Sequence, residues 1–278
     1  MVSASRRSDL VAQFPGWLAE ALAREKVSVS RGTRRPQIVD LRPSSVHTLV
    51  LWSKDFSHLL SNKFSLLDLC QKYDQIFFHL TVTGLGGTLV ERHVPAPETT
   101  LAQVKPLICI AKDKARLRLR FDPVVFWFEG KKLKSNLEFF PLLAKQASSH
   151  GLRQVCFSFA QWYRKAIRRA AQAGFPYFDP PESEKLEAAA WLSKVAEAYD
   201  IELLACAQPF LTVVPGIKPS ACINGAWLEK LHPRQEPVSK RKDKTQRHEC
   251  NCTESIDIGS YAQSCPHSCL YCYANSRL

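Results

Sequence analysis

The segment LRLRFDPVVF, Leu117 to Phe126, has the alternation that decides the fold of this chain. Successive side chains of a strand point to opposite faces of a sheet, so a strand here has one apolar and one polar face. The segment from Gln75 to Thr83 is divided in the same way. In the first segment the apolar face carries Leu117, Leu119 and Phe121, and the polar face carries Arg118, Arg120 and Asp122.

Short runs of this kind alternate with helical patterns along the chain, which is typical of a parallel sheet built from βα units. Pro15 opens one predicted helix, Gly174 ends another from Trp162 to Ala173, and a third extends from Glu182 to Tyr199. The predicted strands are Val2 to Ser5, Val27 to Ser30, His47 to Trp52, Gln75 to Val82, Leu117 to Phe126, Val155 to Phe159, Ile201 to Cys206 and Ser255 to Ile258.

Eight strands are the number that closes a (β/α) barrel of the TIM type. If the apolar strand faces pack against an outer ring of helices, the polar faces line the interior. We therefore expect an α/β barrel that holds a polar, anionic ligand. The alternative is an open sheet with one face in contact with water.

Composition narrows the class of protein. The chain has 278 residues, 45% of them hydrophobic, which indicates a folded globular protein. No apolar run approaches the roughly 18 residues of a membrane span, and the first residues do not form a secretion signal. We therefore expect a cytoplasmic protein without membrane association, in a reducing compartment. The net charge of +12 favours anionic partners, nucleic acid among them.

The cysteines are concentrated at one end of the chain. Five of the 10 cysteines fall in the last 29 residues, after a basic stretch that contains proline but no apolar periodicity. We expect a barrel body over 1–230, a basic linker over 231–249, and the last strand with a cysteine-rich tail over 250–278, the tail belonging to the same domain.

Three of these cysteines, Cys265, Cys269 and Cys272, have the spacing C-x3-C-x2-C. Three thiolates on a tight loop can each bind one iron of a [4Fe-4S] cluster and leave the fourth iron without a protein ligand. Zinc is the alternative, because the nearby Cys250 and Cys252 could help to complete a site of four thiolates.

The triplet, with Tyr271 before its last cysteine, resembles the signature of the radical SAM superfamily. The start SASRRSD and the end ESIDIGSYAQSCPHSCLYCYAN resemble, more closely, an uncharacterised domain-of-unknown-function family related to radical SAM proteins. LWSK, HLTVTG, RFDP, SFAQWYRK, ACAQ and ACING fit the same family. The resemblance implies that the cluster binds S-adenosylmethionine (SAM) and cleaves it reductively to a 5′-deoxyadenosyl radical.

In ordinary radical SAM proteins the triplet follows the first strand, whereas here it follows the last. A circular permutation explains this, and it would make Ser255 to Ile258 the neighbour of Val2 to Ser5. The resemblance then implies that residues after the first strand contact SAM; a structural ion-pair group is the alternative there. The predicted cofactor-binding residues are Ser5, Arg6, Arg7, Asp9, Arg120, Asp122 and Tyr271.

Four further cysteines are grouped by their expected positions at one end of the barrel. Cys206, Cys222, Cys250 and Cys252 are predicted to bind a second [4Fe-4S] cluster or a zinc ion. The remaining cysteines, Cys70, Cys109 and Cys156, are interpreted as small core residues.

Taken together, these features predict a radical SAM enzyme that acts on an unknown substrate, with a nucleotide or nucleic acid as one class. Its expected partner is an electron donor of the flavodoxin or ferredoxin type. Two other hypotheses remain: an iron-sulfur protein for electron transfer or sensing that does not use SAM, and a zinc protein that binds nucleic acid.

Overall fold

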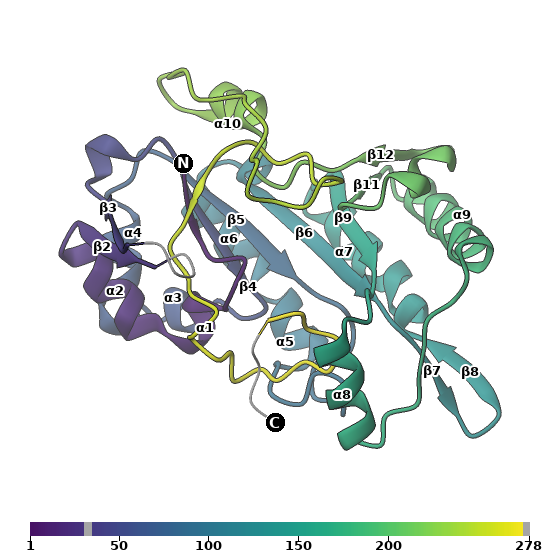
Figure 1. The fold of residues 1–278 in the computed structure, drawn as a ribbon. Helices are drawn as coiled ribbons and strands as arrows, with labels where there is room; N and C mark the ends of the chain where they lie inside the picture. Colours follow the sequence, from purple (N-terminus) through teal and green to yellow (C-terminus); the bar gives the residue numbers. More distant parts are fainter. Residues whose placement is uncertain (31–34, 275–278) are drawn as a thin grey trace.

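An eight-stranded parallel sheet forms the centre of the computed structural model, which describes residues 1–30 and 35–274 (Figure 1). Each strand lies beside the one that precedes it in this sheet along the chain, except that the last lies beside the first. The spatial order is β12 (Ile217–Pro219), β11 (Glu202–Ala205), β9 (Gln154–Phe159), β6 (Leu117–Val124), β5 (Ile76–Thr81), β4 (Leu49–Ser53), β1 (Val2–Ala4) and β13 (Ile256–Asp257).

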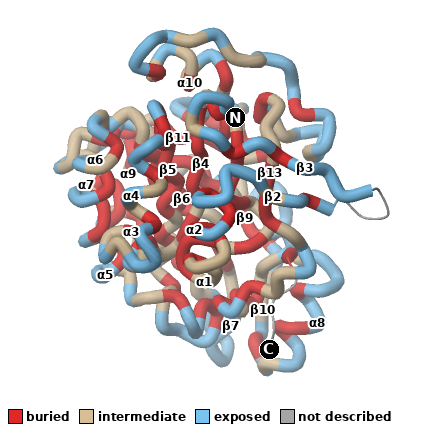
Figure 2. Tube along the Cα trace, turned by 90° about the vertical axis from the view of Figure 1, so that its left-hand side faces the viewer, coloured by how far each residue is buried: buried red, intermediate tan, exposed pale blue. Residues whose placement is uncertain are grey.

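Helices cover one face of this sheet. The predicted apolar residues Leu117, Leu119 and Phe121 are buried there in the main core, together with side chains from the helices on this face. Figure 2 shows buried residues in the interior of the molecule and exposed residues around its outside. The helices with side chains in this core are α1 (Leu10–Gln13), α2 (Pro15–Ala23), α3 (Ser57–Leu60), α4 (Leu66–Cys70), α5 (Pro97–Leu101), α6 (Val104–Ala111), α7 (Phe140–Ser149) and α9 (Glu182–Ala198). Two further helices of the described chain pack elsewhere: α8 (Arg164–Gln172) in a smaller cluster and α10 (Gly225–Leu231) on the opposite face. No helix in the described part of the chain is long and apolar enough to span a membrane.

The opposite face of the sheet does not line a barrel, and it is not fully exposed to solvent. Val50, Phe77 and Leu204 of three strands pack there in a second, smaller core with Leu228 of α10 and Cys252 of the segment before β13. The polar residues Arg118 and Arg120 project from the same face and are buried as well. This face therefore has a cover of its own, made by the chain between β12 and β13.

The barrel expectation is wrong, because the sheet is open and has β12 and β13 as its edges. These strands have three and two residues. The chain between them makes irregular contacts in place of a strand ladder: Thr253 N donates to Ile223 O (2.8 Å) and Gly225 N to Thr253 Oγ1 (2.9 Å). Loops thus fill the position at which a barrel would pair its edge strands.

Local pairing explains the other differences from expectation. The predicted strand at Val27 to Ser30 exists as β2 (Lys26–Val29), but it forms a separate antiparallel hairpin with β3 (Gln37–Asp40). The short strand β12 was not predicted. A third sheet contains β7 (Phe126–Glu129), β8 (Lys132–Ser135) and β10 (Tyr177–Phe178). Residues 275–278, the end of the predicted tail, lie outside the described residues.

The predicted pairing of the first and last strands is confirmed: Val2 lies opposite Ile256, and Ser3 opposite Asp257. The buried carboxylate of Asp257 joins them, because it accepts hydrogen bonds from Ser5 Oγ (2.7 Å), Ser3 Oγ (3.1 Å) and Arg6 N (2.8 Å). The two ends of the chain therefore meet at one edge of the sheet.

We predict that Asp257→Asn lowers the free energy of unfolding by about 2–4 kcal/mol, because the new amide group would face hydrogen-bond donors in a buried site. Urea unfolding under anaerobic, reducing conditions measures the change. The control is Asp74→Asn, which removes an exposed ion pair with Arg234 that is worth less than about 1 kcal/mol. Equal effects of the two substitutions would contradict this role for Asp257.

Candidate functional site

A cavity of about 300 Å³ opens at the carboxyl ends of the parallel strands, where α/β proteins place their ligand sites. Ser5 after β1, Ser53 at the end of β4, Asp122 in β6, Ser158 in β9 and Cys206 after β11 contribute to its wall. All 14 predicted site residues line this cavity, the seven predicted metal-binding cysteines included. Their functional roles remain predictions.

The C-x3-C-x2-C loop forms part of the wall. Cys265 and Cys269 are buried, and Cys272 is partly exposed. Within the described residues, the three sulfur atoms do not all lie within 4.8 Å of one another. Burial raises the pKa of Cys265 to about 11 and also raises that of Cys269. Loss of these thiol protons, which metal binding requires, thus depends on a positive charge nearby.

Two buried cations supply such a charge. Lys54 opposes the rise in the pKa of Cys269, and Arg169 opposes that of Cys272. Lys54 Nζ pairs with Glu91 Oε1 at 2.8 Å, and the Tyr271 hydroxyl donates to the same carboxylate. Tyr271, predicted to bind cofactor, therefore anchors the cysteine loop through its hydroxyl.

Arg169 is held differently. Its guanidinium donates to the carbonyl oxygen of Cys272 and, at 3.4 Å, to that of Ala274. Arg169 belongs to the basic residues of α8, whose helical spacing is typical of a solvated helix face, yet the residue is buried. A helical repeat of basic residues does not reveal that another segment lies across one of them.

Asp9 connects the N-terminal segment to the cysteine loop. Its carboxylate accepts hydrogen bonds from Ala12 N, Ser53 Oγ, Lys54 N and His267 Nε2 at 2.8–3.0 Å. Burial by itself would raise the pKa of Asp9, but the bond to His267 and the other hydrogen bonds lower it overall. Asp9 is consequently a structural anchor with its oxygens already engaged.

Arg6 and Arg7 extend from the same segment to the cavity. Arg7 Nη1 donates to Gly259 O at 3.0 Å. Arg6 Nη2 donates to Ser255 Oγ at 3.0 Å, and Arg6 Nε lies 3.6 Å from Asp257 Oδ2. Arg6 Nε and Nη1 are buried and have no hydrogen-bond partner among the described residues. Arg6 thus lines the cavity with two of its nitrogen atoms beneath the cavity surface.

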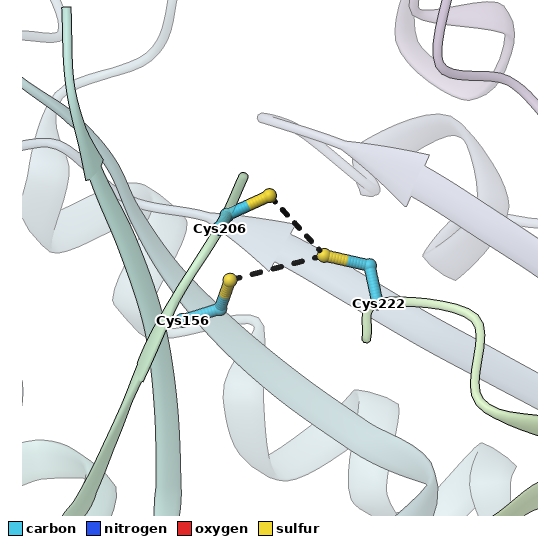
Figure 3. A group of neighbouring side chains, drawn as sticks. All are labelled: Cys156, Cys206 and Cys222. Carbon is cyan, nitrogen blue, oxygen red and sulfur yellow. Dashed lines mark hydrogen bonds between the residues drawn. The ribbon is translucent and has the colours of Figure 1, made fainter. Parts of the chain in front are cut away.

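A second group of sulfur atoms lies against the sheet (Figure 3). Cys222 Sγ is 3.8 Å from Cys156 Sγ and 3.7 Å from Cys206 Sγ, and the three atoms lie within 4.8 Å of one another. This group could bind a metal ion. The core interpretation is confirmed for Cys70 and for Cys156, which is buried in the second core and also belongs to the sulfur group, but Cys109 is exposed.

A buried arginine accompanies the second group. Arg120 Nη1 donates to Cys222 Sγ at 2.7 Å, and Arg120 Nη2 donates to Asp122, which also accepts from the Ser158 hydroxyl. Hydrogen bonds from Cys156, Cys206 and Cys252, with the charge of Arg120, lower the pKa of Cys222. Cys222 is therefore the thiol in this group that loses its proton most readily.

The family model of a domain of unknown function, DUF1848, matches residues 1–274. The chain belongs to this family. The family predicted from the N- and C-terminal motifs is thereby confirmed, while its description assigns no activity. No curated protein and no solved structure matches the chain.

In this DUF1848 protein, sequence reasoning missed several residues that shape the site. Cys156 lies in an apolar run that reads as a core strand, and no pattern distinguishes Glu91 from a surface acid. Lys54 lies within the motif LWSK, and this motif is the sequence feature that points to it. Each of these residues acquires its place through contacts that are distant along the chain.

We predict that Glu91→Gln lowers the free energy of unfolding by about 3 kcal/mol, because it leaves the buried Lys54 ammonium without its counter-charge. Chemical unfolding of the metal-free protein measures the loss. Glu98→Gln, at an exposed position in the first turn of α5, is the matched control and should change little. A stability equal to that of the unsubstituted chain would refute the importance of the buried pair.

Proposed function

We propose that the protein is a radical SAM enzyme in which Cys265, Cys269 and Cys272 bind a [4Fe-4S] cluster at the wall of the cavity. The observation that carries this proposal is that the triplet shares one cavity with Arg6, a cation that lines its wall. A cluster and an anionic ligand could therefore lie side by side.

The donor set fits a cubane cluster. Three thiols on one short loop that lines the cavity can each bind a different iron and leave the fourth iron without a protein ligand. Lys54 and Arg169 contribute positive charge beside the sulfurs, which favours thiolates and a cluster of negative charge. When bound, a reduced cluster supplies the electron that cleaves SAM into methionine and a 5′-deoxyadenosyl radical.

The chain's own residues would bind and orient SAM. Arg6 lines the cavity and would donate to the carboxylate of the methionine moiety, since a guanidinium presents several donors in a fixed plane. Ser5 and Arg7 border the same part of the cavity. Asp9 positions the cysteine loop through His267. Arg120 and Asp122 remain for ribose or substrate.

The proposed classes of substrate and electron donor rest on the basic residues of this chain. The excess of basic residues and the aromatic residues Trp52, Tyr163 and Tyr273 in the wall support a nucleotide or nucleic-acid substrate, whose bases stack on such rings. The exposed Arg164 and Arg168 of α8 suit an acidic donor of the flavodoxin or ferredoxin type. An oxygen-sensitive cluster also suits the reducing cytoplasm.

The decisive experiment is anaerobic reconstitution with iron and sulfide, reduction with dithionite and addition of SAM. We expect 5′-deoxyadenosine, measured by chromatography, and its loss in Cys269→Ala because one iron ligand is missing. Cys109→Ala, at an exposed position, should retain the activity. A cluster without cleavage would favour electron transfer or sensing, and bound zinc without a cluster would favour the nucleic-acid-binding alternative.

A second prediction concerns the carboxylate of SAM. Arg6→Lys keeps the charge but removes the planar donor set, so we expect the Kd for SAM to rise about 10-fold. Equilibrium binding to the reconstituted protein measures Kd, and Arg42→Lys, at an exposed site far along the chain, serves as the control. An unchanged Kd in Arg6→Lys would exclude Arg6 from the binding site.

A further inference from the structure

We propose that Cys156, Cys206, Cys222 and Cys252 bind a single zinc ion in tetrahedral geometry, and that this ion joins the two open edges of the sheet. The site is separate from the C-x3-C-x2-C loop and does not depend on the proposed radical SAM activity. It also differs from the second cluster that the sequence suggested, because it includes Cys156 and leaves out Cys250.

The spacing of the sulfur atoms indicates a single ion. With a zinc–sulfur bond of about 2.3 Å, tetrahedral geometry places two sulfur ligands about 3.8 Å apart. The distances from Cys222 to Cys156 and to Cys206 are 3.8 Å and 3.7 Å. Figure 3 shows the three side chains converging from β9, from the residue after β11 and from the loop after β12. A cubane would require these sulfurs to separate, because each would bind a different iron.

We assign Cys252 as the fourth ligand because of its position near Cys222. It is buried in the same cluster of side chains as Cys156 and Cys222, and its sulfur accepts from Ile223 N, beside Cys222 in the chain, at 3.4 Å. Backbone N–H donors to sulfur stabilise thiolate charge, as hydrogen bonds to a charged form do in general. Cys250 is two residues earlier and partly exposed. Neither of these two cysteines is among the three sulfurs that already lie within 4.8 Å of one another, so metal binding would draw the Cys252 sulfur in toward them.

The charge around the group agrees with metal-bound thiolates. Four thiolates with Zn²⁺ carry a net charge of about −2, which a buried site must offset. Arg120 donates to Cys222 Sγ at 2.7 Å and is 7% exposed, so it supplies a cation directly at the sulfur. Asp122 already pairs with this guanidinium, so a thiolate at Cys222 would share the cation with that carboxylate.

The position of the site gives the ion a structural role. Cys222 follows β12 and Cys252 precedes β13, which are the two edge strands of the sheet. A bound ion would link them through metal–sulfur bonds at the point where no strand ladder closes the sheet. Through Arg120 it would also hold Asp122 at the cavity wall.

The test begins with the triple variant Cys265→Ala, Cys269→Ala, Cys272→Ala, which removes the proposed cluster and leaves the second group intact. Metal analysis after anaerobic purification should give about one zinc per chain and no iron. Cobalt substitution should give the visible absorption of a tetrahedral thiolate site. About four irons per chain with a cluster signal, or no bound metal, would overturn the proposal.

The ligand set is tested in the same triple variant. Adding Cys156→Ser should abolish zinc binding and lower Tm, whereas the matched change Cys250→Ser should retain the ion. The reverse pattern would overturn the assignment. If Cys156→Ser does not fold, the triple variant still tests the site, because the intensity of sulfur-to-cobalt charge transfer measures the number of thiolates bound to cobalt. Four bound thiolates would support the site, and two or fewer would overturn it.

Discussion

The Asp257 carboxylate holds together two parts of the chain that lie more than 250 residues apart, and the cavity depends on this contact. Because β1 pairs with β13, the basic segment after β1 and the cysteine loop after β13 begin at the same edge of the sheet. Gly259 allows the approach, since a Cβ atom there would lie 2.0 Å from Ser5 Oγ. Without this pairing, Arg6 and the cysteine triplet would have no common wall.

The buried charges of the cavity are organised around sulfur. Lys54 is paired with Glu91, Arg169 is held by backbone carbonyls, and Arg120 is paired with Asp122. Burying a cation is costly unless a partner offsets it, so each has an anchor and also faces a cysteine. Lys54 and Arg169 therefore oppose the rise in thiol pKa that burial causes at Cys269 and Cys272, and metal binding requires the deprotonated sulfur.

The strands and their two faces could be predicted because apolar and polar residues alternate along them. The meeting of the termini could be predicted because the C-x3-C-x2-C motif follows the last strand instead of the first. It did not predict that the sheet stays open. Val27 to Ser30 alternates like a strand of the large sheet but pairs with its neighbour in sequence, and β12 is too short to show any period. The sequence indicates a core position for Cys156 because its neighbours Val155 and Phe157 are apolar. Its place beside two other sulfur atoms depends on residues that are distant along the chain.

The open sheet and the second sulfur group have one physical explanation. A closed barrel satisfies its edge strands through hydrogen bonds, but here the edges end in loops whose contacts are few and irregular. Cys222 and Cys252 lie on those two loops and belong to one cluster of buried side chains with Cys156 of β9. Metal–thiolate bonds are directional and strong, so one ion can fix two loops that have no ladder between them. The proposed ion would also account for thiols at a position where a barrel would place apolar side chains, because it would link the two loops by coordination and not by strand pairing.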